Sequence, residues 1–139
     1  MEFVMKKMNR AVKKLWADHL RSDAYTQNFE FDESAGGIPL RTEDDTWSAF
    51  GVLCNIHAQT FPSVAKYELS KESYLGYHYF LPHEVSTWAG LKPTDDQFDC
   101  YIKFKSTVTI QNEKFNSIEE MSLAKIPFYM IADIIEEKL

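Results

Sequence analysis

Cys54 and His57 are the residues of this chain whose types and spacing come nearest to a reactive pair. They stand three positions apart, so they would share one face of a helix, and a thiolate beside an imidazole is the start of a nucleophilic site. Cys54 lies, however, in the most apolar stretch, residues 46–58, where burial raises the pKa of a thiol and makes it inert. We therefore expect Cys54 to be a packing residue and name no catalytic residue. A thiol-dependent enzyme that uses this pair stays as a third hypothesis for the function.

Residues 74–80 could bind a partner, because they are rich in tyrosine. Aromatic residues favour strands, and alternation along a strand would place Tyr77 and Tyr79 on one face, where exposed tyrosines anchor protein interfaces. The alternative is a half-buried strand that only packs. Another alternative is a pocket for a small molecule or a nucleotide, lined by the tyrosines and by converging polar groups. The polar groups expected in such a pocket are Arg41, Asn55 and His57.

The sequence predicts no metal site and no cofactor. A zinc site needs four well-placed ligands, and the spacing of the available side chains fits no standard zinc pattern. Those side chains are Cys54, His57, His78 and His83. The chain also contains no phosphate-binding loop, no GxSxG motif and no dinucleotide fingerprint. Its adjacent carboxylates would point in different directions on a helix, which makes them poor acid–base machinery.

The composition indicates a folded protein of the cytoplasm. The 139 residues suit a single domain, 1–139, and the 45% hydrophobic and 14% aromatic content is enough to build a core. The chain has no apolar run long enough to span a membrane, and no apolar segment of a secretory signal follows the basic N-terminus. Cys54 and Cys100 are typical of reduced core thiols, although a disulfide between them stays open.

The charge is unevenly distributed along the chain. Residues 1–21 contain six basic and two acidic side chains, whereas the remainder contains nine basic and nineteen acidic ones. An acidic body disfavours nucleic-acid binding, because attraction to phosphates supplies most of that affinity. The charge suits either simple solubility or docking on a basic surface of another protein.

Hydrophobic periodicity and capping residues predict the elements that position these side chains. We expect residues 3–21 to form an amphipathic helix whose apolar face packs on the core. Residues 22–45 read as a long loop with a short strand or ordered turn near 38–41. Thr46 is expected to cap a buried helix at 47–59, whose small residues allow neighbours to approach closely.

In the second half of the chain we expect helices to alternate with strands. A helix is predicted at 81–91, with Pro82 in its first turn and Gly90 as its C-terminal cap. Apolar residues with a period of two predict an antiparallel hairpin that spans about 98–116. The remaining elements are a helix capped by Ser117 and a last helix at 127–138. Together they predict an α+β fold, a single small domain of about four helices packed around a small antiparallel sheet or hairpin.

A series of short motifs runs along most of the chain. The motifs are Trp16 in the first helix, Tyr25-x-Gln27, Leu40-Arg41, Gly51-Val52-Leu53-Cys54, Leu81-Pro82 with Trp88-x-Gly90-Leu91, and Ile131-Ala132-Asp133-x-Ile135-Glu136. In this series the chain resembles an uncharacterised family of small proteins from bacteriophages and prophages. It departs from that family's pattern at Ser48-Ala49, where paired cysteines are usual, at Asn55, where an aspartate is usual, and at 122–125, where an Asn-Asp turn is usual.

The resemblance implies an origin in a phage or prophage and action in the cytoplasm of the host, and it implies no reaction. Together with the apolar setting of Cys54, it predicts a non-enzymatic binding protein, an inhibitor or modulator of a host protein such as one of a defence system. The alternatives are the small-molecule or nucleotide-binding module and the thiol-dependent enzyme. The expected binding residues are Tyr77, Tyr79, Arg41, Asn55 and His57.

Overall fold

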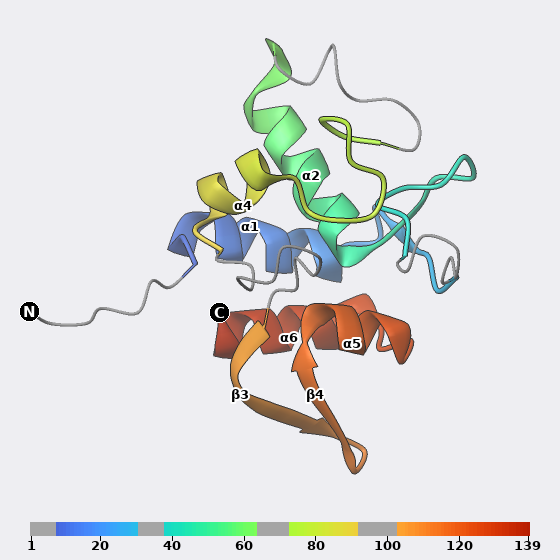
Figure 1. Ribbon diagram of the computed structural model, residues 1–139, viewed down its shortest axis with the longest axis vertical. Coiled ribbons are helices and arrows are strands. Elements are labelled where there is room, and N and C mark those ends of the chain that lie inside the picture. Colours follow the sequence, from blue (N-terminus) through green and yellow to red (C-terminus); the bar gives the residue numbers. More distant parts are fainter. Residues whose placement is uncertain (1–7, 31–37, 64–72, 92–102) are drawn as a thin grey trace, which may run out of the picture.

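The computed structural model describes residues 8–30, 38–63, 73–91 and 103–139. These residues form five helices and two small sheets of two strands each (Figure 1). The helices are α1 (Arg10–Arg21), α2 (Ala49–Thr60), α4 (His83–Ala89), α5 (Ile118–Leu123) and α6 (Phe128–Lys138). The strands are β1 (Thr26–Gln27), β2 (Thr46–Trp47), β3 (Lys103–Ile110) and β4 (Glu113–Ser117). The expected α+β class is confirmed, with five helices in the described part of the chain where about four were expected.

The helices form layers across the molecule (Figure 1). Helix α1 lies between α2 and α4 on one side and α6 on the other, and α1 runs antiparallel to α6. The β3–β4 hairpin packs on the far side of α5 and α6. Most of the core therefore lies between helices, and the hairpin adds a layer at one end of the molecule.

The apolar face of α1 packs on the core, as its periodicity predicts. The helix begins after Asn9, whose side chain accepts a hydrogen bond from the backbone N–H of Val12 at 3.1 Å. Residues 3–7 of the expected helix lie outside the described part of the chain, and Met8 and Asn9 precede the helix. Trp16 is fully buried, and its Nε1–H donates to the backbone oxygen of Ala49 at 2.9 Å. Its ring lies 6.1 Å from the ring of Phe50. One side chain thus fixes α1 against the first turn of α2.

Helix α2 begins at Ala49, directly after its N-cap residue Ser48. The Ser48 hydroxyl accepts a hydrogen bond from the backbone N–H of Gly51 at 3.1 Å, which satisfies one of the free donors of the first turn. The prediction that Thr46 caps this helix is wrong, because Thr46 lies in β2, which pairs in parallel with β1. The Thr46 hydroxyl instead lies 2.6 Å from that of Thr42.

Gly51 marks the closest approach of α2 to another segment. A Cβ atom at this position would lie 1.7 Å from the backbone oxygen of Leu40, so only glycine fits here. The same oxygen accepts a hydrogen bond from the backbone N–H of Ser48 at 3.1 Å. The short strand or turn expected near this point is confirmed, because Arg41 forms an antiparallel bridge with Trp47.

The tyrosine-rich segment forms a tight turn, not the expected strand. The backbone N–H of Tyr74 donates to the oxygen of Tyr77 at 2.8 Å, and the N–H of Tyr77 donates back at 2.9 Å. Leu75 and Gly76 between them have φ values of 52° and 84°, which reverse the chain direction. Tyr74 is buried and Tyr77 is exposed. The prediction of Tyr77 and Tyr79 on one face of a strand is therefore wrong.

Residues that favour turns and caps place the remaining elements as predicted. Gly90 ends α4 with the left-handed φ of 75°, as predicted, whereas Pro82 is the residue before the helix and not part of its first turn. The β3–β4 hairpin is antiparallel, although residues 98–102 of the predicted hairpin lie outside the described residues. Ser117 caps α5, and its hydroxyl accepts a hydrogen bond from the backbone N–H of Glu120 at 3.2 Å.

Gln27 joins the first half of the chain to the C-terminal helices. Its Nε2 donates to the backbone oxygen of Ile126 at 2.8 Å, and its Oε1 accepts from the backbone N–H of Phe128 at 2.8 Å. The first N–H groups of a helix have no partner within the helix, and Pro127, which precedes α6, offers no side-chain oxygen. Gln27 therefore caps α6 from a distant part of the sequence.

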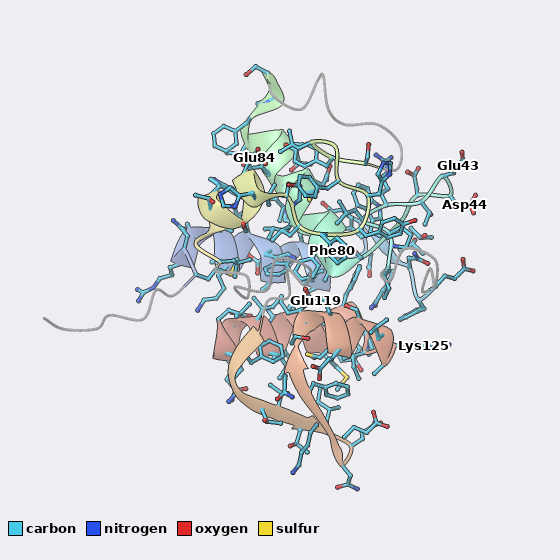
Figure 2. All side chains as sticks on the ribbon, in the orientation of Figure 1. Glu43, Asp44, Phe80, Glu84, Glu119 and Lys125 are labelled. Carbon is cyan, nitrogen blue, oxygen red and sulfur yellow. The ribbon has the colours of Figure 1, made fainter. Side chains whose placement is uncertain are left out.

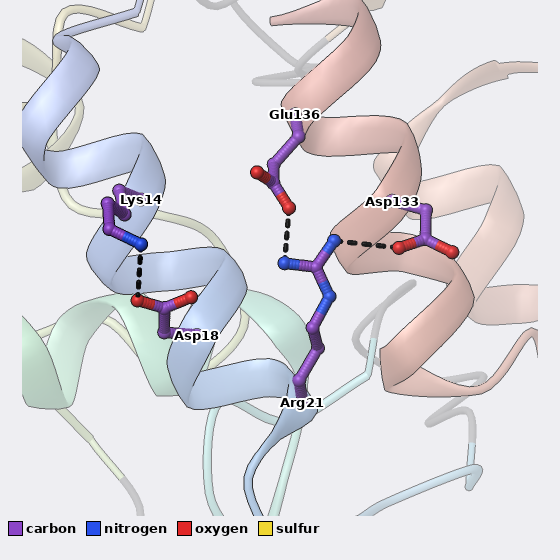
Figure 3. A network of polar contacts seen from close by, with 5 residues as sticks. All are labelled: Lys14, Asp18, Arg21, Asp133 and Glu136. Carbon is purple, nitrogen blue, oxygen red and sulfur yellow. Dashed lines mark hydrogen bonds and ion pairs between the residues drawn. The ribbon is translucent and has the colours of Figure 1, made fainter.

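A second link from α1 to α6 is made by Arg21 (Figure 3). Its Nη2 lies 2.7 Å from Oδ1 of Asp133, and its Nη1 pairs with Glu136. The hydrogen bond to Asp133 is the largest of the effects that raise the pKa of Arg21. All three side chains are substantially exposed, so the network contributes little to stability beyond fixing the relative position of the two helices.

Candidate binding site

Arg41 is the charged side chain around which the candidate site is built. Its guanidinium carbon lies 4.7 Å from the centre of the Trp47 ring, within the range of a cation–π contact. Its Nε donates to Oδ1 of Asp45 at 2.9 Å, and its Nη2 contacts the same oxygen. The Arg41 side chain is 27% exposed, so these contacts hold the guanidinium in one position at the surface.

Asp45 reaches Arg41 because a tight turn folds the chain back. The backbone N–H of Thr42 donates to the oxygen of Thr46 at 2.9 Å, and the N–H of Asp45 donates to the oxygen of Thr42 at 3.0 Å. Asp45 has a φ of 59°, in the left-handed region that Asp and Asn enter more readily than most side chains. The exposed tip of this turn carries two further acidic residues, Glu43 and Asp44 (Figure 2).

Two hollows meet at Arg41. The inner hollow has a cavity volume of about 10 Å³, roughly the space of one water molecule, and is lined by Leu40, Arg41, Trp47, Gly51, Cys54, Asn55, Ser73 and Tyr74. The outer hollow has a cavity volume of about 180 Å³ and is lined by Pro39, Arg41, Thr42, His78 and Tyr79. Pockets for drug-sized ligands usually measure roughly 300–1,000 Å³, so the inner hollow is too small for a ligand and the outer one has room for a small group only.

Asn55 lines the inner hollow, but its amide is used within the protein. Its Nδ2 donates to the hydroxyl of Tyr25 at 2.9 Å, and the same hydroxyl lies 2.9 Å from Nδ1 of His19. The Tyr25 ring meets the edge of the Trp47 ring at 5.2 Å. Burial raises the pKa of Tyr25, and the hydrogen bond from Asn55 partly offsets this rise. Asn55 thus supports the aromatic residues behind Arg41.

Cys54 and His57 do not form a reactive pair. Cys54 is 2% exposed, and burial raises the pKa of its thiol far above the ordinary value. The Nδ1 of His57 lies 2.6 Å from the hydroxyl of Tyr74, whose own pKa is raised to about 12, mainly by burial. Burial lowers the pKa of His57, and Glu84 opposes this shift. The predicted role of Cys54 as a packing residue is confirmed.

The structure brings together some of the five predicted binding residues and separates others. Arg41 shares the inner hollow with Asn55 and the outer hollow with Tyr79. Tyr77 is 40% exposed at the end of its turn. His57 is buried among aromatic rings and lines neither of these two hollows.

Two residues of this site, Asp45 and Trp47, were not among the predicted binding residues. The four-residue spacing from Arg41 to Asp45 could have suggested an ion pair, but outside a helix such a spacing brings side chains together only when a turn folds the backbone. The contact with Trp47 likewise depends on the bridge between two short extended segments. Neither contact of Arg41 could be predicted from the sequence alone.

Within 8–30, 38–63, 73–91 and 103–139, no three side chains of His, Cys, Asp or Glu come together as a metal site. In the same residues, no helix has both the length and the apolar character needed to cross a membrane.

The fold and the site define a small α+β protein with a fixed surface arginine between two hollows. Residues 8–139 match the family model described as a domain of unknown function (DUF8296), and the chain belongs to this family. No curated protein and no solved structure matches the chain significantly.

Proposed function

We propose that this protein is a non-enzymatic binding protein of phage or prophage origin, which acts in the cytoplasm of the bacterial host on a host protein. In this proposal it inhibits or modulates its partner, for example a protein of a defence system. The observation that carries the proposal is the burial of Cys54, which makes the candidate nucleophile a packing residue. The resemblance of the motifs to those of small phage and prophage proteins supports the proposed origin.

The surface beside Arg41 has the chemistry of a protein interface. The backbone N–H of Leu40 donates to the oxygen of His78 at 2.8 Å, so the segment with Arg41 and the segment with Tyr77 and Tyr79 lie side by side. Tyrosine and arginine are the residues most often found at the energetic centre of interfaces. Tyr77 is held on a turn closed by two backbone hydrogen bonds, so a partner could bind it at a small cost in conformational entropy.

Affinity purification from the bacterial host tests this proposal. We expect a host protein to co-elute with the tagged protein in a constant ratio, as measured by mass spectrometry. Tyr77→Ala should reduce the co-eluted amount at least about tenfold, because loss of a central interface tyrosine commonly costs ~2 kcal/mol or more. The matched control is Tyr129→Ala, since Tyr129 is also exposed but lies on α6. Equal recovery with both variants, or no constant partner, would contradict the proposal.

The two alternative functions differ in what supports them. A thiol-dependent enzyme would need Cys54 in contact with solvent, and this thiol is only 2% exposed, while Nδ1 of His57 lies 2.6 Å from the hydroxyl of Tyr74. A small-molecule or nucleotide-binding module has a specific observation in its favour, the outer hollow beside Arg41. This second function is kept for that reason.

A further inference from the structure

The guanidinium of Arg41 has donors that the protein itself does not use. A guanidinium carries five N–H donors in a planar fork. The Nε–H and one N–H of Nη2 face Asp45, and in the described part of the chain the other three have no protein partner. Because the Trp47 ring already holds the group in place, a ligand would lose little affinity to the ordering of this side chain.

The outer hollow adds further polar groups around the guanidinium. Its two walls, the segment of Pro39–Thr42 and the segment of His78 and Tyr79, are tied by the Leu40–His78 hydrogen bond. The walls contribute the exposed imidazole of His78, which can donate a hydrogen bond, whereas the hydroxyl of Thr42 already lies 2.6 Å from that of Thr46. Arginine with such donors fits an oxyanion with several acceptor oxygens, and phosphoryl groups are bound by arginine in a bidentate way.

We infer that the outer hollow binds a phosphoryl group, with Arg41 as the main ligand-binding residue and Asp45 as an internal competitor for its guanidinium. This inference does not depend on the proposed host protein, because the phosphoryl group could belong to a nucleotide or to a phosphorylated protein side chain.

Asp45 is the part of the site that makes the inference testable in two directions. Its carboxylate contacts two N–H groups of Arg41 through one oxygen, on a turn that holds Asp45 at a φ of 59°. A ligand must weaken this contact, and the acidic Glu43 and Asp44 at the tip also oppose an anion (Figure 2). We therefore expect affinity for a phosphoryl group alone to be weak, on the order of millimolar. Removal of the Asp45 charge should strengthen it.

The experiment is a titration of the ¹⁵N-labelled full chain with inorganic phosphate, a nucleoside monophosphate and a phosphotyrosine peptide, each followed by amide chemical shifts. Saturable shifts are expected for Thr42, His78 and Tyr79. Arg41→Gln should weaken binding about 10- to 100-fold, the range expected for loss of hydrogen bonds to a charged group. Asp45→Asn should strengthen binding several-fold, because Asn accepts the left-handed backbone and removes the charge.

The control is Arg21→Gln, which removes an arginine that pairs with two carboxylates on α6 (Figure 3) and lines neither hollow. Its affinity for each probe should equal that of the unchanged protein. The inference is overturned if no probe gives saturable shifts, if Arg41→Gln binds as well as Arg21→Gln, or if Asp45→Asn binds more weakly. Tighter binding of the nucleotide or of the peptide supports the site in either case and assigns the source of the phosphoryl group. Loss of the co-purified host protein in Tyr77→Ala is a separate result, so each proposal can fail alone.

Discussion

Substitution of Gly51 by alanine tests the central contact of the fold. Alanine favours a helix over glycine by about 1 kcal/mol, so helix propensity alone predicts that Gly51→Ala stabilises α2. The structure predicts the opposite, because the new Cβ would lie 1.7 Å from the backbone oxygen of Leu40, well under the 3.0 Å that real Cβ contacts keep. A backbone atom cannot rotate away as the end of a side chain can, so α2 or the Leu40 segment must move by more than ~1 Å.

The expected loss of stability follows from that movement. Overpacking of a buried position costs about 1–3 kcal/mol. The shift also draws the Leu40 oxygen away from the N–H of Ser48, now at 3.1 Å, and a buried hydrogen bond lost in this way costs about 1–3 kcal/mol. After the gain of about 1 kcal/mol in helix propensity, Gly51→Ala should lower the free energy of unfolding by about 1–5 kcal/mol. With a urea m-value of about 2 kcal/mol per molar, the unfolding midpoint should fall by ~0.5–2.5 M.

Tryptophan fluorescence during urea unfolding measures this change, and Gly76→Ala provides the matched control. Gly76 has a φ of 84°, and a Cβ there would have no atom within 4 Å. That variant should lose only the ~1–2 kcal/mol of the unfavourable left-handed backbone. The reasoning is refuted if Gly51→Ala costs no more than Gly76→Ala, and still more clearly if Gly51→Ala is stabilising.

Three further predictions concern other buried contacts. Gln27→Ala should lower the free energy of unfolding by about 2 kcal/mol, because the N–H of Phe128 and the oxygen of Ile126 both lose a partner, and Gln27→Glu should recover only part of it. Cys54 should react with a thiol reagent only as fast as the protein unfolds, since its thiol is buried and its pKa raised; a rapid reaction without denaturant would contradict this. Burial holds the pKa of His57 below the ordinary 6.5, so the folded state binds a proton at this residue less readily than the unfolded state does. The free energy of unfolding should therefore have its full value above pH 6.5 and fall as the pH is lowered below 6.5. In urea melts between pH 7 and pH 5, His57→Gln should reduce this slope, and an unchanged slope would contradict the prediction.

Elements marked by local residue chemistry were predictable from the sequence. Pro82 and Gly90 bound α4, and Ser117 caps α5, because each of these residues satisfies or interrupts backbone hydrogen bonds within a few positions. The choice between Thr46 and Ser48 as the cap of α2 was not predictable in this way. Both carry a hydroxyl, and the choice depends on the pairing of β2 with β1, which joins residues twenty positions apart.

The candidate site was predictable as a set of polar residues but not as an arrangement. Arg41 and Asn55 do share a hollow, whereas His57 lies apart because Tyr74 takes its hydrogen bond inside the aromatic core. The aromatic residues of the tyrosine-rich segment favour a strand, but Gly76 permits a turn that sends Tyr74 inward and leaves Tyr77 exposed. Propensity could not decide between strand and turn, because burial of Tyr74 against His57 depends on the rest of the fold.

Most of the motifs along this chain are explained by packing, and one is not. Trp16 fixes α1 to α2, Gln27 caps α6, and Gly51 lets α2 approach the backbone of Leu40. Arg41 has no comparable task, because its contacts with Trp47 and Asp45 lie at the surface and a surface ion pair contributes little to stability. A guanidinium that is fixed in position, partly exposed and only partly hydrogen-bonded is more useful for binding than for folding. Function in this protein should therefore be sought first at Arg41 and the hollow beside it.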